Sequence, residues 1–392
     1  MAETKKETKK EVERKKEKGT EEKGTEEGMP LIVSNIKITK ESIIESKELL
    51  ELFQNMKKYD IKNPRSLLPA SHWYSVEFKL KNTFAGFANS IRRVLMEEMK
   101  VKCLTITEKN IQTDDDFILS DFIIKNINLV PINQELDNNF MEKNNVYLYK
   151  YNNTNDIIDV MMSDIKISNK KDSKNVDLEK LIPESCIILV RLRPGKFIKL
   201  ISFDIEEGYA KNNYAKFTLL DNIQYYPIYP DNVVPFDNFT SSGTRSVEVD
   251  PTEFFISFTT SGNISVEKTI NDCSSTLIER LNKAKKKVEK FSSSKQETKY
   301  YYDENFEVII QDEMYIYKFY QEYLTLANLV TQQCFLLDYN ISFCVPAVSR
   351  FDNEIAIIKL IHAEPNKLLI SSIEICIHNL EIWRDSILKN IK

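Results

Sequence analysis

The chain has few of the residues on which most reaction sites depend. Its 392 residues include only 8 glycines and 3 histidines. So little glycine disfavours glycine-rich phosphate-binding loops, and His72, His362 and His378 lack the spacing of metal ligands. The six cysteines contain no C-x-x-C pair, which argues against a structural zinc site. No part of the sequence has the pattern of an active site.

Long apolar runs are also missing, so the sequence predicts neither a membrane span nor a secretory signal. The formal net charge of -5 argues against a protein that its overall field would steer onto nucleic acid. Scattered cysteines are typical of small buried side chains in a reducing compartment. We therefore expect a soluble, intracellular protein.

Composition and periodicity predict an α+β fold with two similar units of sheet and helices, the first carrying a large β-rich insertion. The tail is Lys/Glu-rich with almost no apolar side chains, which predicts disorder. A capping box at Ser42–Glu45, followed by Leu49, Leu50 and Phe53, predicts a helix. The expected divisions are a disordered charged tail (1–30), an N-terminal helical extension (31–72), the first unit (73–113 and 246–291), the insert domain (114–245), a linker (292–300) and the second unit (301–392).

One segment, Asn82 to Leu95, has the pattern of an association helix. Asn82 is the predicted N-cap, and Gly86 and Ala88 are small enough for another helix to approach closely. Arg92 and Arg93 lie near the helix end, where cations suit the helix dipole. Apolar residues surround most of the circumference, which indicates two packing partners. They are Phe84, Phe87, Ala88, Ile91, Val94 and Leu95.

Apolar residues at spacings of three and four predict three further long helices, over 266–291, 325–337 and 365–391. In the last of these, Leu380, Trp383 and Ile387 lie on the apolar side. We expect the helices at 82–99 and 266–291 to pack against those at 325–337 and 365–391.

Two charged clusters have alternative interpretations. Asp114, Asp115 and Asp116 could bind Mg²⁺, but consecutive acids point in different directions, so a solvated turn capping the next helix is favoured. The lysines at 283, 285, 286 and 287 could contact phosphates, but they lie on a helix with an apolar opposite side. A solvated helix face is favoured there.

The segment Asn82-Thr83-Phe84-Ala85 through Asn89-Ser90-Ile91-Arg92-Arg93-Val94-Leu95 resembles the N-T-F-A-N-A-L-R-R-I-L-L signature of the α-like subunits of DNA-directed RNA polymerase. The resemblance continues from Asp121 to Ile132, with Lys125, Asn126 and Asn128 in place of the family's His, Arg and Gly. Arg193–Lys196 and Gly208–Phe217 resemble segments of that family's insert domain. This part of the chain is similar to the third-largest (archaeal D-type) subunit.

The terminal unit resembles a different member, the eleventh (archaeal L-type) subunit. Leu324–Val330 is similar to its H-T-L-G-N-L-L motif, and Ser342–Val348 is similar to its G-Y-x-x-P-H-P motif. Fusion of two subunits that are otherwise separate chains resembles the arrangement in some large cytoplasmic DNA viruses.

This resemblance implies a non-catalytic assembly subunit with two α-subunit-type dimerisation units in one chain. The implied partners are the largest and second-largest polymerase subunits, which supply the catalytic aspartates, Mg²⁺ and the grip on DNA, together with other small subunits. No catalytic residue or cofactor is expected in this chain. Some members of the family hold zinc or an iron–sulfur cluster with cysteines of the insert, and only Cys186 lies in that region here, so no such metal is expected. Arg92 and Arg93 match positions that contact the second-largest subunit, and the implied location is the host cytoplasm or virion. The expected partner-interface residues are Asn82, Thr83, Phe84, Phe87, Asn89, Ile91, Arg92, Arg93, Leu95, Thr325, Leu326, Asn328, Leu329, Leu380, Trp383 and Ile387.

Two other function classes remain open from the residues alone. A free-standing homodimeric adaptor or nucleic-acid-binding protein would use the basic helix and the tail, and would bind DNA with a strong salt dependence. An enzyme with a metal at Asp114–Asp116 would need Mg²⁺-dependent hydrolysis by the purified chain.

Overall fold

The computed structural model of the chain describes residues 30–41, 73–183, 187–212, 215–229, 251–293, 299–338, 341–348 and 354–391. The fold is mixed α+β, and all its sheets are antiparallel. Residues 1–29, the predicted helix that begins near Ser42 and most of the predicted linker lie outside the described residues. None of the helices within these ranges is long and apolar enough to cross a membrane.

A four-stranded sheet begins the fold. Its strands alternate buried and half-exposed positions, so Val76, Phe78 and Leu80 of the second strand all lie in the core. The strand order is β1-β2-β13-β12, with β1 at Ile32–Glu41, β2 at Trp73–Lys81, β12 at Leu220–Ile228 and β13 at Glu253–Ser261. The predicted helical extension at 31–72 is therefore wrong for residues 32–41. There Ile36 and Ile38 pack against the core while Lys37 and Thr39 are exposed, which is the alternation of a strand.

Three helical segments accompany this sheet. The first is α3 (Ala85–Arg93), which continues as the π-helical turn η3 (Val94–Glu98) and packs on β12 and β13. The long helix α6 (Val266–Ser293) follows β13 after a turn. Its apolar stripe of Ile270, Leu277, Leu281, Ala284 and Val288 is buried.

The C-terminal part of the chain, residues 299–391, repeats the theme of a sheet covered by helices. The sheet order is β14-β15-β16-β18-β17, with β14 at Tyr300–Asp303, β15 at Phe306–Gln311, β16 at Met314–Tyr320, β17 at Phe343–Val348 and β18 at Ile355–Ile361. Helix α7 (Leu324–Leu337) packs on β17 and β18, and α8 (Pro365–Leu388) packs on α7.

Between η3 and β12 the chain builds a second hydrophobic core, separate from the first. A five-stranded sheet of order β4-β10-β5-β7-β8 and a two-stranded sheet β6-β9 surround it with two short helices. The bounds are β4 Ile111–Thr113, α4 Ser120–Asn128, α5 Phe140–Lys143, β5 Asn144–Tyr151, β6 Ile158–Met161, β7 Lys166–Asn169, β8 Asn175–Val176, β9 Ile188–Leu192 and β10 Phe197–Ile201. Short 3-10 turns connect them at η4 Glu108–Asn110, η5 Met162–Asp164 and η6 Leu178–Lys180.

The predicted insert boundaries, 114 and 245, need correction at both ends. β3 (Val101–Thr105) pairs with β11 (Asp204–Gly208), and β4 pairs with β10, so the chain leaves the first sheet before residue 114. It returns before residue 245, because β12 pairs with β13 along almost its full length. The reason is that strand partners come from distant segments, which a local pattern does not reveal.

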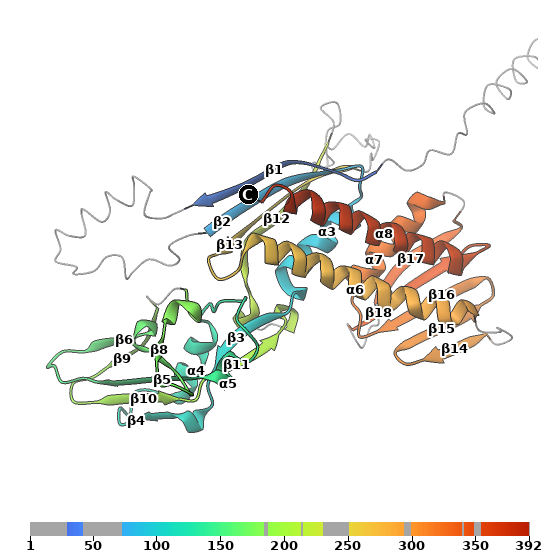
Figure 1. The fold of residues 1–392 in the computed structure, drawn as a ribbon. Helices are drawn as coiled ribbons and strands as arrows, with labels where there is room; N and C mark the ends of the chain where they lie inside the picture. The colour runs from blue at the N-terminus through green and yellow to red at the C-terminus, as the bar shows by residue number, and fades with distance from the viewer. Residues whose placement is uncertain are drawn as a thin grey trace, which may run out of the picture.

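The N-terminal part, residues 30–293, shares one hydrophobic core with the C-terminal part. A single cluster of buried side chains runs from β2, α3 and α6 to α7, α8 and the second sheet. Figure 1 shows α6 and α8 running side by side, with the insert domain at the lower left, below the first sheet and away from the second. The rings of Phe78 on β2 and Trp383 on α8 lie 6.1 Å apart, so the two parts meet through large side chains.

We expect Trp383→Ala to lower the free energy of unfolding by about 3–5 kcal/mol, because it empties a fully buried ring site between the two parts. Urea unfolding of the full chain measures this loss. Leu336→Ala is the matched control, since Leu336 is 49% exposed on α7 and should change stability by about 0.5 kcal/mol or less. Equal effects of the two substitutions would contradict a core shared through α8.

Candidate assembly interface

Helix α3 approaches α7 closely at Gly86. The Gly86 amide donates a hydrogen bond to Gln332 Oε1 at 2.6 Å. A Cβ atom at this position would lie 2.6 Å from the same oxygen and 3.2 Å from the Asn328 carbonyl oxygen. A larger residue would therefore require the Gln332 side chain to move and the α7 backbone to shift slightly, and the small-residue position noted in the sequence is where the two helices touch.

Most of the expected interface residues are buried in the shared core. The buried ones are Thr83, Phe87, Ile91, Leu95, Thr325, Leu326, Leu329, Leu380, Trp383 and Ile387. Those at half-buried positions are Asn82, Phe84, Asn89, Arg92, Arg93 and Asn328. Buried Cys273 of α6 and Cys376 of α8 direct their Sγ atoms at the Ile91 and Leu329 carbonyl oxygens, 3.9 and 4.0 Å away. Burial raises the pKa of both thiols, so they behave as small apolar side chains.

Asn82 does not cap α3, contrary to the sequence prediction. Phe84 occupies the N-cap position without a side-chain cap. Asn82 instead adopts a φ of 56°, a left-handed conformation that asparagine tolerates better than most residues, and its amide donates to the Pro30 carbonyl oxygen at 3.1 Å. It therefore joins the end of β2 to the segment before β1.

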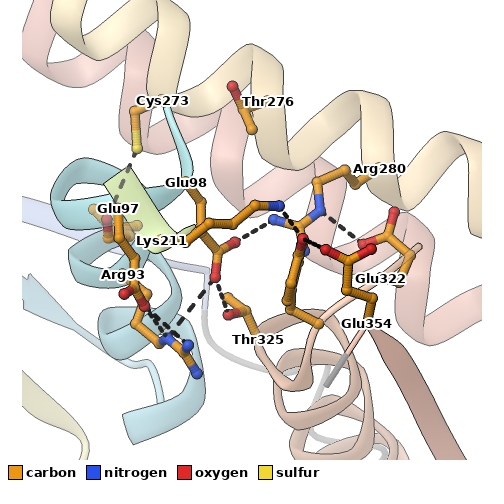
Figure 2. Close-up of polar contacts among 12 residues, drawn as sticks. Arg93, Glu97, Glu98, Lys211, Cys273, Thr276, Arg280, Glu322, Thr325 and Glu354 are labelled. Carbon is orange, nitrogen blue, oxygen red and sulfur yellow. Dashed lines mark hydrogen bonds and ion pairs between the residues drawn. The ribbon is translucent and has the colours of Figure 1, made fainter. Parts of the chain in front are cut away.

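A buried polar network joins the two parts where η3, α6 and the start of α7 meet (Figure 2). We call Glu98, Arg280, Glu322 and Thr325 the interface network. Glu98 accepts a hydrogen bond from Thr325 Oγ1 at 2.6 Å and forms an ion pair with Arg280 Nη1. Arg280 Nε donates to Glu322 Oε2 at 2.8 Å. One guanidinium from the N-terminal part thus lies between a carboxylate of its own part and one of the C-terminal part.

The charge of Arg280 is held by these two carboxylates. Burial by itself lowers the pKa of the guanidinium, but Glu322 and Glu98 together raise that pKa above its usual value. A cation buried in this way needs its partners, because removing them leaves an uncompensated charge away from water.

Further contacts connect the chain segment that follows the insert domain to Tyr323, whose ring centroid lies 5.6 Å from the Arg280 guanidinium. Lys211, in the 3-10 turn η7 (Ala210–Asn212), lies with its Nζ 3.6 Å from the Tyr323 ring centroid and donates to the Tyr323 hydroxyl. That hydroxyl donates to Glu354 Oε1 at 3.0 Å. Burial lowers the pKa of Lys211 and raises that of Tyr323. A further turn, η8 (Ala215–Phe217), then leads into β12.

Sequence reasoning included Thr325 among the expected interface residues but missed the three charged members of the network, although one signal could have found Arg280. Arg280 lies three residues after Leu277 and four before Ala284, which places a charged side chain beside the apolar stripe of α6. A charge at such a position is either paired or at the edge of the stripe. No sequence pattern singles out Glu98 or Glu322 as its partners.

Arg92 and Arg93 are held in place at the half-exposed edge of α3. Arg92 Nε donates to Asn89 Oδ1 at 3.0 Å, and the guanidinium lies 5.6 Å from the Tyr225 ring centroid. Arg93 Nη2 lies 2.9 Å from Glu97 Oε1. Both side chains therefore have fixed orientations while remaining half-exposed.

The acidic cluster is only in part the solvated turn that the sequence favoured, because Asp114 and Asp116 are exposed but Asp115 is not. Asp115 is buried and accepts hydrogen bonds from Arg193 Nε at 2.9 Å and from the Phe117 amide at 3.2 Å. The hydrogen bond from the Arg193 side chain is the main cause that lowers the pKa of the Asp115 carboxyl below its usual value, and the backbone amides of Phe117 and Arg193 lower it further. The following helix, α4, has no side-chain cap. Across the described residues, no group of histidine, cysteine, aspartate or glutamate side chains is arranged to hold a metal ion.

The interpretation of the α6 lysines as a solvated helix face is wrong for two of them. Lys285 forms an ion pair with Glu374 of α8 at 2.7 Å, and Lys287 donates to the Asn305 carbonyl oxygen at 3.1 Å. These two lysines contact the C-terminal part of the chain and are not simply a solvated face.

Comparison with known protein families finds no family model that matches this chain, and comparison with curated proteins finds no match either.

We expect Arg280→Met to lower the free energy of unfolding by about 3–5 kcal/mol, because Glu98 and Glu322 lose their buried cation. Urea or thermal unfolding of the full chain measures the loss. Arg191→Met is the matched control, because its side chain is largely exposed and its surface ion pair contributes about 1 kcal/mol at most. A loss no larger than that of the control would show that the network does not hold the two parts together.

Proposed function

We propose that this chain is a non-catalytic assembly subunit of a multisubunit DNA-directed RNA polymerase, folded as an intramolecular dimer of two α-subunit-type units. The observation that carries the proposal is the shared hydrophobic core, in which α3 contacts α7 and α6 contacts α8. The resemblance of the two parts to paired polymerase subunits implies this kind of helix contact. In this assignment the first dimerisation unit contains β1, β2, β12, β13, α3 and α6, and the insert domain interrupts it.

The positions of the two motifs support the proposal. The segment Asn82–Leu95, which resembles the α-like signature, covers α3 and the start of η3. The segment Leu324–Val330, which resembles the eleventh-subunit motif, forms the first half of α7. The two meet at the contact of Gly86 with the Asn328 carbonyl and Gln332. Two motifs found independently along the sequence thus lie against each other.

The proposed partners are the largest and second-largest polymerase subunits, which would carry the catalytic aspartates, Mg²⁺ and the DNA contacts. Arg92 and Arg93 suit a contact with the second-largest subunit, because guanidinium groups offer several donors and are weakly hydrated. Their neighbour Met96 is exposed on the same turn and adds apolar surface. The chain itself would perform no reaction, and its location would be that of the polymerase, in the host cytoplasm or virion if the source is viral.

The rival homodimeric adaptor finds less support in the geometry. The helix faces that would pair two copies of the chain are covered within one copy by α7 and α8. Lys285 and Lys287, two of the lysines that would contact nucleic acid, are engaged with Glu374 and the Asn305 carbonyl.

We expect the double substitution Arg92→Ala and Arg93→Ala to leave the chain folded but to reduce co-purification of the two large subunits at least tenfold. The reason is that both side chains lie at the edge of α3 and make their hydrogen bonds within α3 and η3. Arg93 Nε is also 3.8 Å from Glu98 Oε1, but Glu98 keeps its closer partners Arg280 and Thr325 in the variant. Affinity purification of the tagged chain at native abundance, with quantitative mass spectrometry, measures this.

Arg191→Ala, an exposed arginine on the insert domain, is the control and should co-purify like the unchanged protein. If the unchanged chain co-purifies no large polymerase subunits, the proposed function is wrong. If it does and the double variant assembles equally well, the role of the two arginines is wrong.

A further inference from the structure

The five-stranded sheet of the insert domain has one buried face and one exposed face. Val146, Leu148, Ile167, Ile198 and Leu200 fill the second hydrophobic core from one side. The strand register places the alternate residues together on the opposite side, which we call the outer sheet face. Its members are Gln112, Asn145, Tyr147, Tyr149, Tyr151, Lys166, Ser168, Asn175, Phe197, Lys199 and Ile201.

A row of aromatic side chains follows β5 across this face. Tyr147, Tyr149 and Tyr151 are 36, 58 and 52% exposed, and the Tyr149 ring lies 6.4 Å from that of Phe197 on β10. Alternate residues of a strand are about 6.7 Å apart, so each ring presents separate surface to solvent. The opposite face of the sheet already supplies its core, so these three rings form a row of planar apolar surface that faces solvent.

Lysines lie directly across the strands from two of these rings. Lys199 of β10 is the register partner of Tyr149, and Lys166 of β7 is the register partner of Tyr147. Both lysines are exposed, and neither forms an ion pair with an acidic side chain of the described residues. The outer sheet face contains no aspartate or glutamate at any of its positions. This local excess of positive charge contrasts with the net charge of -5 of the whole chain.

We propose that the outer sheet face binds single-stranded nucleic acid. Exposed rings stack on unpaired bases whatever their sequence, and the neighbouring lysines attract the phosphates. A duplex fits the site poorly, because its bases are already stacked on one another and cannot lie on the rings. An acidic protein partner would also be attracted by the lysines, but it has no row of flat, unpaired bases to stack on successive rings. The proposal rests on the insert domain alone and does not depend on the polymerase assignment.

The test is fluorescence anisotropy of the full chain with labelled oligouridylate and oligothymidylate of about ten nucleotides, at low and at physiological salt. We expect Tyr149→Ala combined with Tyr151→Ala to weaken binding about tenfold or more. Tyr149→Phe combined with Tyr151→Phe keeps the rings and should bind within about twofold of the unchanged chain. Tyr302→Ala, at a tyrosine 60% exposed on β14, is the control and should bind normally.

The lysines have a separate readout. Lys166→Gln combined with Lys199→Gln should reduce the slope of log affinity against log salt by about 1.4, the value expected for two lost phosphate contacts. Preference for the ribose or the deoxyribose oligomer would support the proposal and identify the strand.

The proposal is overturned if the unchanged chain does not bind at low salt, or if the double alanine variant binds as the control does. It is also overturned if a duplex of equal length binds as tightly as the single strands, since binding would then come from charge elsewhere, such as the lysines of residues 1–29. Because the assay uses the chain without partners, its outcome is independent of co-purification with large subunits.

Discussion

The structure depends on the burial of apolar helix faces between the N-terminal and C-terminal parts. Without α8, Phe78 of the first sheet would lose the Trp383 ring that covers it. Without α3, the surface of α7 that Gly86 contacts would face solvent. Exposed apolar surface of this extent is rare in soluble proteins, so each part completes the fold of the other. Joining both parts in one chain keeps them at an effective concentration on the order of millimolar, which removes the dependence on dilution.

The interface network restricts the geometry of this packing. Apolar side chains tolerate small shifts, whereas the Arg280 guanidinium needs Glu98 and Glu322 within hydrogen-bond reach. A displacement of α6 by one turn would leave buried charges unpaired, at a cost far greater than that of a changed apolar contact. The network therefore fixes the relative positions of η3, α6 and α7, while the hydrophobic core supplies most of the free energy.

The sequence allowed prediction of elements whose pattern is local and failed where the partner is distant. Apolar residues at spacings of three and four predicted α3, α6, α7 and α8 almost to their ends. The same reasoning could not place β12, because its pairing with β13 joins segments that lie apart in the chain. Asp115 looked like a surface turn because its partner, Arg193, is 78 residues away. The charged members of the interface network, Glu98, Arg280 and Glu322, were missed for this reason too.

The candidate interface was predicted in part for a physical reason. Burial of Ile91 or Leu326 follows from a helical stripe, which one segment of sequence contains in full. The orientation of Arg92 and Arg93 depends on Asn89 and Glu97, neighbours within one turn, but whether a partner contacts these arginines is not encoded in the helix. Local sequence thus predicts which residues are buried, and only the assembled fold shows which elements bury them.

The chain segments that lead into and out of the insert domain both lie beside the interface network. The outgoing strand, β3, begins three residues after Glu98, and the returning strand, β11, ends three residues before Lys211. These two strands pair with each other, so the connection is a double-stranded ribbon with both ends held by the same cluster of contacts. Such a ribbon resists bending far better than a single linker would, because five register pairs must be broken to hinge it. The orientation of the insert domain, and of the outer sheet face that it carries, is therefore fixed by this ribbon together with contacts to the turn before α6. There the Gln134 amide donates to the Asn263 carbonyl oxygen at 2.9 Å, and Ser265 Oγ donates to Glu135 Oε1 at 2.6 Å.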